Sequence, residues 1–378
     1  MQAVSAQAWN ALLDQQTEPN PFMRHAYLLA MEQSGSASSV TGWQLRVLTL
    51  REATQDPGLA VPSGQLAGAM VLYIKPHSYG EYVFDWAWAD AYQRHGLNYY
   101  PKAVSAVPFT PVPGARILAT CEASQGALLE AAVGLAQQEG WSSLHLLFLS
   151  PSDLQATERA GWLSRHTVQF HWHNQGFADF EHFLQSLNQE KRKKIKQERR
   201  KVKDAGVSFH ALEGEEIQNA DWDFFYKCYA QTYFEHGNAP YLNRDFFQRM
   251  EENMPQNWVL FIAERAGKRM ACSLIGIENN VAYGRYWGAL ERVDCLHFEA
   301  CYYQPIEWCI QKGFERFEGG AQGEHKMARA LLPIKASSAH WLAHPGFADA
   351  VEKYLEREGH GIEAYLENLE ARSPLKLK

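Results

Sequence analysis

One stretch, residues 281–326, limits what this chain can fold into more than any other. Residues 281–289 are aromatic and interspersed with glycine, which is typical of a strand that another backbone or a ligand approaches closely. Residues 299–312 carry apolar side chains at helical spacing and are followed by Gly313, a helix-ending residue; a second strand-like run comes next, at 314–318. Ligands bind beyond the carboxyl ends of strands in open α/β sheets, so we expect a site in the glycine-rich segment that follows.

Several motifs resemble those of one bacterial family. The sequence reads Y-G-R-Y-W-G-A at 283–289, H-F-E-x-x-Y-Y-Q-x-I-E at 297–307 and F-E-G-G-A-Q-G-E-H-K at 317–326. In the N-terminal half, H-S-Y-G-E-Y-V-F-D-W-A-W-A-D-A-Y at 77–92 and V-P-F-T-P-V-P-G-A-R at 107–116 fit the same family. The chain therefore resembles the FemAB-like, GNAT-type peptidoglycan biosynthesis/recognition proteins. This resemblance implies two GNAT-like modules and a role in acyl or aminoacyl transfer.

The length of the chain agrees with this organisation. At 378 residues it exceeds one typical core, and about two domains are expected. From the resemblance we expect an α/β (α+β) fold with two tandem GNAT-like (acyl-CoA N-acyltransferase) modules of the FemABX type. The predicted modules span 1–174 and 175–347, the second with a basic helix at 191–203, and 348–378 is predicted to be a helical tail.

Composition excludes several classes of protein. Hydrophobic residues at 46% and charged residues at 21% are ordinary for a globular chain, and no apolar run is long enough to span a membrane. The sequence lacks a recognisable leader, and its six cysteines form no pairing pattern, so we expect a cytoplasmic protein with reduced thiols. A net charge of −7 argues against a generally nucleic-acid-coated surface but permits a local basic patch. The oligomeric state cannot be read from the sequence.

Acyl transfer to an amine needs a proton acceptor and a polarised donor carbonyl. His325 lies in the loop after the second strand and Glu318 at the end of that strand, so each is a candidate catalytic base. The ordinary pKa of histidine suits this role, whereas a glutamate needs its pKa raised by burial. Gly323 and the neighbouring glycines are expected to present backbone N–H groups to the carbonyl oxygen.

Other side chains are expected to bind substrate. Arg285 and Trp287 share one face of the first strand, because alternate residues of a strand point the same way. Near residue 85 an acidic group stands among aromatic rings, a combination that can hold an amine or a sugar and that equally can fill a core. The predicted substrate-binding residues are Arg285, Trp287, Glu299, Gln322, Gly323, Lys326, Asp85 and Trp86.

A strongly basic run occupies residues 191–203, with nine Lys or Arg in thirteen positions. On a helix these charges cannot all lie on one face, so the run is expected to be exposed and ready to bind an anion. Candidate anions are the acceptor end of tRNA, the diphosphate of a lipid-linked sugar, and CoA, with Lys194 and Arg199 as contacts. The simpler interpretation is a solvated helix paired with acidic residues elsewhere in the chain.

The acyl donor stays open between an acyl-CoA and an aminoacyl-tRNA, and no tightly bound cofactor is expected. In the first module the segment with Gly114 and Arg116 partly matches the glycine-rich loop that binds the CoA pyrophosphate in GNAT enzymes. At the equivalent place in the second module, Asp294 and Glu299 put negative charge where a phosphate would bind, which disfavours CoA there. FemABX-type enzymes lack this loop and use aminoacyl-tRNA.

Two functions from different classes follow. The first is an N-acyltransferase that acts on an amine, either a small molecule or a cell-wall precursor. For this function, any binding of tRNA is assigned to the basic helix. The alternative is a non-catalytic module that recognises a peptidoglycan precursor or an amino sugar. No metal is predicted: His171 and His173 flank Trp172 on one strand but have no third ligand nearby.

Overall fold

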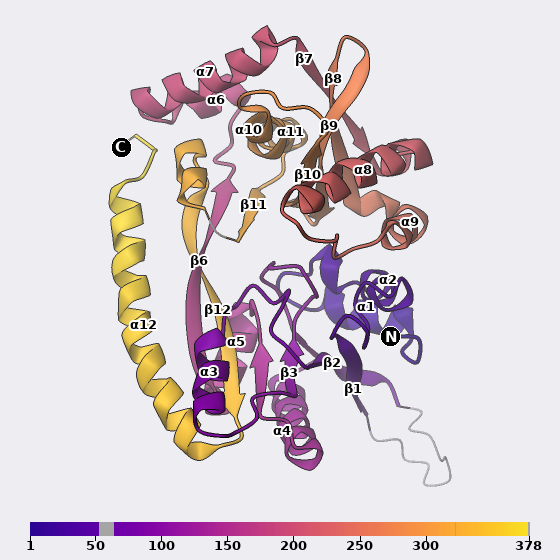
Figure 1. Cartoon of the computed structure of the whole chain (residues 1–378), viewed down its shortest axis with the longest axis vertical. Helices are drawn as coiled ribbons and strands as arrows, with labels where there is room; N and C mark the ends of the chain where they lie inside the picture. The colour runs from indigo at the N-terminus through magenta and orange to yellow at the C-terminus, as the bar shows by residue number, and fades with distance from the viewer. Residues whose placement is uncertain (53–63, 322, 377–378) are drawn as a thin grey trace. The chain divides into compact units, whose positions relative to one another are not determined.

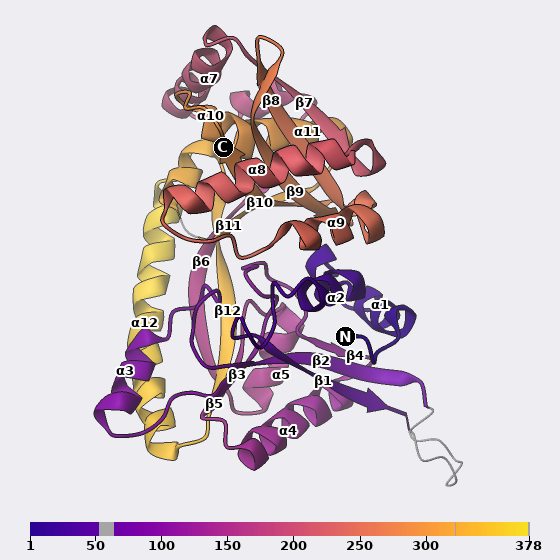
Figure 2. The same cartoon turned by 45° about the vertical axis from the view of Figure 1, so that its right-hand side comes forward.

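The computed structural model describes residues 1–52, 64–321 and 323–376. The turn-rich loop expected near residues 56–64 lies almost wholly outside these. The chain divides into two compact units: unit 1 comprises Met1–Thr167 with Lys335–Ala364, and unit 2 comprises Val168–Ile334 with Tyr365–Lys378. Figures 1 and 2 show the elements of both units from two directions.

Unit 1 combines helices with a mainly antiparallel sheet. Its elements are α1 (Ala6–Asp14), α2 (His25–Gln33), β1 (Gln44–Arg51), β2 (Leu66–Lys75), α3 (Trp86–Arg94), β3 (Lys102–Ser105), β4 (Ile117–Ala119), α4 (Glu122–Glu139), β5 (Ser143–Leu146) and α5 (Pro151–Arg159). The strand order is β1-β2-β3-β5, with β4 paired to β2 and only β3 and β5 parallel. Helix α4 buries Leu128, Leu129 and Ala132 against this sheet, which forms the main core of the unit.

Unit 2 has the alternation of strands and helices expected from residues 281–318. Its elements are α6 (Phe180–Gln185), α7 (Gln189–Asp204), β7 (Val207–Glu213), α8 (Asn219–Glu235), α9 (Arg244–Asn253), β8 (Trp258–Arg265), β9 (Lys268–Glu278), β10 (Val281–Ala289), α10 (Leu296–Phe298), α11 (Gln304–Lys312) and β11 (Arg316–Ala321). The strand order is β11-β10-β9-β8-β7, in which only β10 and β11 are parallel. A π-helical turn, Glu299–Tyr303, joins α10 to α11.

Helix α8 packs directly on the backbone of β10. A Cβ added to Gly288 would lie 1.9 Å from the carbonyl oxygen of Cys228, so only glycine permits this approach. Thr232 Oγ1 on the same helix donates to the carbonyl of Trp287 at 3.0 Å. These contacts fix the strand that carries the predicted site against the helix layer.

Three elements belong to both units, and this differs from the predicted division at residues 174 and 347. The unit boundaries fall within β6 (Leu163–His173), β12 (Leu332–Leu342) and α12 (Pro345–Ala371). Strand β12 had been expected to close the second module. Instead, its residues Ala339–Leu342 pair antiparallel with β5, and Lys335–Ala364 belongs to unit 1. Sequence order does not reveal this exchange because β5 lies almost 200 residues earlier in the chain.

Candidate functional site

The predicted site lies where two parallel strands of unit 2 part. Strands β10 and β11 pair at Val281–Arg316, Ala282–Phe317 and Tyr283–Glu318, and then continue without further pairing to each other. We call this divergence the fork. Strands that separate leave room between their backbones, so the fork can admit a ligand.

A β-bulge in β10 lies at the start of the fork. Gly284 pairs with Ile275 and Tyr286 with Leu274, so Arg285 is the extra residue of the bulge. Bulges redirect side chains and occur next to functional sites. The bulge therefore accounts for the direction of the Arg285 side chain, toward the fork.

A cavity of about 130 Å³ occupies the fork. It is formed by β9, β10, β11 and the helical segment that follows β10. Its polar and aromatic lining residues include Ser273, Arg285, Trp287, His297, Cys301 and Tyr302. The structure thus brings together Arg285 and Trp287, both predicted to bind substrate, at one cavity.

Glycine at position 319 permits close packing of β11 against its neighbours at the fork. A Cβ there would lie 2.4 Å from Leu331 Cδ2 and 3.0 Å from the carbonyl oxygen of Phe170. The sequence had suggested that such glycines serve to expose backbone donors. At this position the visible requirement is close packing.

His325 reaches the cavity through a tyrosine. It lies in the short 3-10 helix Glu324–Arg329, and its Nε2 is 3.2 Å from the hydroxyl oxygen of Tyr302, which lines the cavity. Gly323 has φ of +102°, and a Cβ there would come within 2.5 Å of the imidazole ring. Glycine is therefore needed both for this backbone conformation and for the position of His325.

The pair of side chains is neutral near pH 7. Partial burial and the positive charges of Arg329 and Lys326 lower the pKa of His325 below its ordinary value. Burial raises the pKa of Tyr302 well above the usual phenol value. An uncharged imidazole and a phenol in hydrogen-bond contact can accept and donate a proton respectively.

Burial also lowers the pKa values of two further basic groups near the cavity. Lys326 is buried, its Nζ donates to the carbonyl of Gly320 at 3.0 Å, and burial lowers its pKa to about 8. His297 packs against Trp287 with ring centroids 5.3 Å apart, and burial lowers its pKa to about 4. The fork is thus a partly dry environment that disfavours positive charge: His297 is neutral near pH 7, whereas Lys326 is still mostly protonated.

Glu318, the other predicted base, does not line this cavity, although its neighbours Phe317 and Gly319 do. Alternation along the strand directs its side chain to the opposite face. There Arg316 Nε is 3.1 Å from Glu318 Oε1, and His171 Nε2 is 3.8 Å from Oε2. Because burial lowers the pKa of His171 to about 3, that second contact is not an ion pair. We therefore assign no catalytic role to Glu318.

Arg199 and Glu299, predicted to bind cofactor and substrate, bind each other. Arg199 Nη2 lies 3.0 Å from Glu299 Oε1 and 2.6 Å from Glu307 Oε2, and its guanidinium stacks 4.4 Å from the centroid of the Phe180 ring. Glu299 is only 4% exposed. These contacts attach α7 to the helical segment after β10, so the two residues have a structural role.

The rest of α7 presents free positive charge. Its buried residues are Ile195, Glu198 and Val202. In the described part of the chain, no acidic partner within ion-pair distance is found for five exposed basic residues of the helix: Lys193, Lys194, Arg200, Lys201 and Lys203. The predicted exposure of the basic run is confirmed for these residues, Lys194 included.

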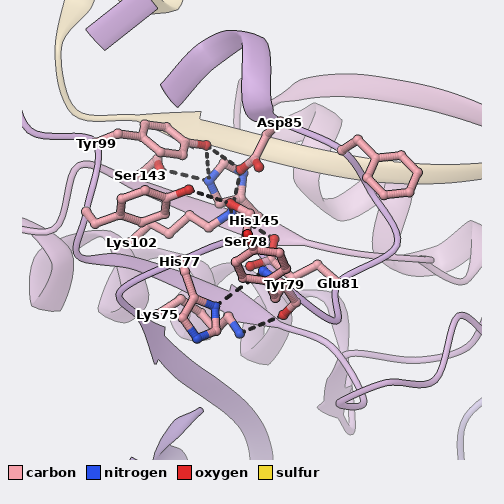
Figure 3. A network of polar contacts seen from close by, with 12 residues as sticks. Lys75, His77, Ser78, Tyr79, Glu81, Asp85, Tyr99, Lys102, Ser143 and His145 are labelled. Carbon is pink, nitrogen blue, oxygen red and sulfur yellow. Dashed lines mark hydrogen bonds and ion pairs between the residues drawn. The ribbon is translucent and has the colours of Figure 1, made fainter. Parts of the chain in front are cut away.

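The predicted site residues of unit 1 lie in two places. Arg116 is fully buried, its Nε donates to the carbonyl of Leu147 at 2.9 Å, and burial lowers its pKa to about 10. A Cβ on Gly114 would lie 2.2 Å from Asn20 Nδ2. This segment is consequently internal, and the expected phosphate loop is not formed there. Asp85 is buried in a charged cluster (Figure 3), and the neighbouring Trp86 is exposed.

Sequence reasoning missed two of the lining residues, His297 and Tyr302, whereas Cys301 was expected beside the site as a packed thiol. His297 lay in the segment before the predicted helix, and Tyr302 counted as an apolar position of that helix. The π-helical turn at Glu299–Tyr303 changes which side chains face the sheet, and Pro305 just after it was the available signal of an irregular helix. Gln322, also predicted to bind substrate, lies outside the described residues.

Comparison with known proteins agrees with this geometry. The sequence profile of the FemAB-like family, described as peptidoglycan biosynthesis/recognition, matches residues 1–377. The chain belongs to the FemAB-like family. No curated protein shows significant sequence similarity to this FemAB-like chain.

Solved structures establish the fold of this FemAB-like protein. The crystal structure of FemX matches with a TM-score of 0.55 at 10% identity, covering 92% of this chain and 98% of FemX. L-PGS from Bacillus licheniformis matches with a TM-score of 0.53 at 10% identity, covering 93% of this chain and 97% of L-PGS. The predicted family and fold class are confirmed. Among the described residues, no helix has the length and apolar character needed to cross a bilayer.

Proposed function

We propose that this FemAB-like protein is an N-acyltransferase that holds the reacting acyl or aminoacyl group in the fork of unit 2. The observation that carries the proposal is the contact between Tyr302, which lines the cavity, and His325, 3.2 Å away. The cavity volume of about 130 Å³ is below the ~300 Å³ lower bound typical of pockets for drug-sized ligands. It therefore suits a small acyl or aminoacyl group and not its carrier.

The chemistry follows from the protonation states. The neutral amine nitrogen attacks the donor carbonyl carbon, a C–N bond forms, and the C–O bond of an ester or the C–S bond of a thioester breaks. His325 takes the proton lost by the amine through the Tyr302 hydroxyl, and the departing oxygen or sulfur is protonated in turn. The guanidinium of Arg285, which lines the cavity, supplies positive charge for the oxygen that becomes negative in the transition state.

For the donor we propose aminoacyl-tRNA ahead of acyl-CoA. The five unpaired basic residues of α7 belong to the same unit as the fork and suit a polyanion. Asp294, exposed just after β10, is unfavourable for a pyrophosphate there. An acyl-CoA remains the second donor to assay, because its thioester undergoes the same attack.

The test is an acyl-transfer assay with both donors and a panel of amine acceptors. We expect His325→Ala and Tyr302→Phe each to lower kcat by about 10²-fold, the lower end of the range for general acid–base catalysis. His210→Ala is the matched control, because His210 is an exposed histidine on β7 of the same unit. Transfer that survives both site variants unchanged contradicts the proposed chemistry. Binding of an amine acceptor without transfer from any donor favours a recognition module instead.

A further inference from the structure

Unit 1 contains a buried group of charged side chains that the proposed transfer does not use (Figure 3). At its centre is Lys102, which is fully buried. Its Nζ donates to Ser78 Oγ at 2.8 Å and to Glu81 Oε2 at 2.7 Å, and it also pairs with Asp85 Oδ2. An ammonium has three donors, so these contacts use all of them. We call Lys102, Ser78, Glu81 and Asp85 the Lys102 cluster.

Uncharged side chains form hydrogen bonds along one side of this cluster. The Tyr99 hydroxyl donates to Asp85 Oδ2 at 2.6 Å and lies 3.2 Å from His145 Nε2. His145 Nδ1 is in turn 2.7 Å from Nδ1 of His340. Burial lowers the pKa of both histidines, His145 to about 3, so neither adds positive charge. The network fixes Asp85 through Oδ2 and, among the described residues, provides no hydrogen bond to Oδ1.

Each acid of the cluster retains one unused oxygen. Glu81 Oε1 and Asp85 Oδ1 are buried and have no hydrogen-bond partner within the described chain, and each residue is 3% exposed. A buried acceptor without a donor opposes folding, and a cluster with a purely structural role is readily replaced by apolar side chains. The two oxygens are thus positioned to receive N–H groups that the chain itself does not supply.

A second lysine lies within electrostatic reach of these acids. Lys75 is fully buried, and its Nζ donates to the Tyr79 carbonyl at 3.1 Å and lies 3.5 Å from the centroid of the Trp43 ring. Burial lowers its pKa to about 7, with Glu81 opposing that change. Near neutral pH Lys75 can therefore lose its proton when another positive charge binds beside it.

Aromatic side chains flank the cluster at the surface. Tyr79, whose carbonyl holds Lys75, is 62% exposed, and Trp86, which directly follows Asp85, is 39% exposed. Their rings meet edge to face with centroids 5.2 Å apart. We call these two residues the aromatic rim. Exposed aromatic faces beside carboxylates are the combination that recognises organic ammonium groups.

We propose that the Lys102 cluster and the aromatic rim bind the ammonium group of a primary amine. The unused oxygens of Glu81 and Asp85 accept its N–H groups, and Tyr79 and Trp86 contact its carbon skeleton. Because both oxygens are shielded in the unliganded chain, binding includes a movement of nearby side chains. This site lies in unit 1 and stands independently of the transfer reaction proposed for unit 2.

Two alternative ligands fit less well. For a divalent metal, the described residues contain no group of three or more His, Cys, Asp or Glu that could hold the ion. An anion would lie against two carboxylates, which is unfavourable. A primary amine satisfies both acids and leaves Lys75 free to become neutral.

The test measures amine binding to the full-length protein by calorimetry, without any acyl donor. The probes are glucosamine and Nα-acetyl-lysine, with N-acetylglucosamine and Nα,Nε-diacetyl-lysine as matched ligands that lack the amine. We expect at least one amine to bind about tenfold or more tightly than its acetylated counterpart. Selective binding of glucosamine identifies an amino sugar as the source of the amine, and selective binding of the lysine derivative identifies a peptide side chain.

Variants locate the binding. Asp85→Asn should weaken amine binding about tenfold and Trp86→Ala several-fold, whereas Phe234→Ala, which removes an exposed ring of unit 2, should leave it unchanged. Trp86→Ala keeps the test valid if Asp85→Asn fails to fold. Equal affinity for amine and acetylated probes, or amine binding unaffected by Trp86→Ala, would overturn the proposal. His325→Ala should not alter this binding, which separates it from the transfer reaction.

Discussion

The Lys102 cluster of unit 1 and the fork of unit 2 both bury ionisable groups, with opposite results. In the cluster, Glu81 and Asp85 raise the pKa of Lys102, and Lys102 helps to lower that of Asp85 to about 2, so Lys102 and Asp85 stay charged, whereas burial raises the pKa of Glu81 to about 7. In the fork, burial lowers the pKa of Lys326 to about 8 and that of His297 to about 4. Burial shifts each group toward its neutral form, and a buried opposite charge opposes that shift, fully for Asp85 and only in part for Glu81.

This difference suits the two regions to different tasks. Fixed charges recognise a ligand of opposite charge, whereas neutral acids and bases exchange protons with a reacting group. The predictions below test this distinction, from the largest expected effect to the smallest.

The largest effect is expected when the cluster loses its cation. Lys102→Met leaves Glu81 and Asp85 buried without compensation, and breaking a buried ion pair in this way costs about 3–5 kcal/mol. The measurement is the free energy of unfolding by urea. Adding Glu81→Gln and Asp85→Asn to Lys102→Met should recover much of the loss. A loss below about 1 kcal/mol for the single variant would show that the cluster is not held by charge.

A smaller loss of folding stability is expected when the pH is lowered. His145 of unit 1 and His171 of unit 2 have folded-state pKa values of about 3, below the ordinary 6.5, because both are buried. As the pH falls below 6.5, the unfolded state binds protons first, so their contribution to stability is full above that pH and declines toward pH 3. At pH 5 the decline is up to about 2 kcal/mol for each.

The comparison of wild type with single variants isolates this effect. The stability advantage of wild type over His145→Gln, and over His171→Gln, should shrink between pH 7 and pH 5. His210→Gln, at an exposed position of β7, is the reference. A difference that stays constant across this range would show that the two imidazoles bind protons as readily in the folded chain as in the unfolded one.

How much of this could be predicted from sequence depends on the distance between partners in the chain. Part of the fork was predictable: Arg285 and Trp287 were expected on one strand face, and the order of strand, helix and strand placed His325 beyond the carboxyl end, but the bulge at Arg285 was not foreseen. The Lys102 cluster was not predictable from the sequence, apart from the expectation that Asp85 binds substrate. Its hydrogen bonds join residues far apart in sequence, the extreme being His145 to His340, 195 positions away.

Three assignments within the site differ from the contacts in the structure, and each difference has a physical cause. Glu318 was taken as a base because it ends a strand, but alternation turns it to the face opposite Phe317, where it meets Arg316. Tyr302 was taken as core because a regular helix was assumed. Arg199 was taken as an anion contact because its acidic partner Glu307 follows 108 positions later.

A further prediction concerns the backbone that supports the fork. Gly323→Ala places a side chain at φ of +102° and within 2.5 Å of the His325 ring, so the imidazole must leave Tyr302. We expect a stability loss of about 1 kcal/mol and a fall in kcat of about tenfold. Gly176→Ala is a matched control, since Gly176 has φ of +77° and open space around it. Equal activity of the two variants would contradict the role of the Tyr302–His325 contact.

The smallest effect is expected from single charges on α7. Lys194→Ala should weaken binding of tRNA a few-fold and reduce the slope of log affinity against log salt by about 1, as loss of one phosphate contact does. Filter binding at several salt concentrations measures both. Lys268→Ala, at an exposed lysine of the β8–β9 hairpin, is the control. The same loss in both variants would indicate a general charge effect and no defined tRNA surface on α7.

The most direct test of the account is the position of a bound donor. A crystal structure of the protein with a non-hydrolysable 3′-aminoacyl-adenosine analogue should show the aminoacyl group in the fork, with its carbonyl near Arg285 and Tyr302. Density for the analogue at any other place in the molecule, with the fork still closed to it, would contradict the assignment of acyl transfer to the fork.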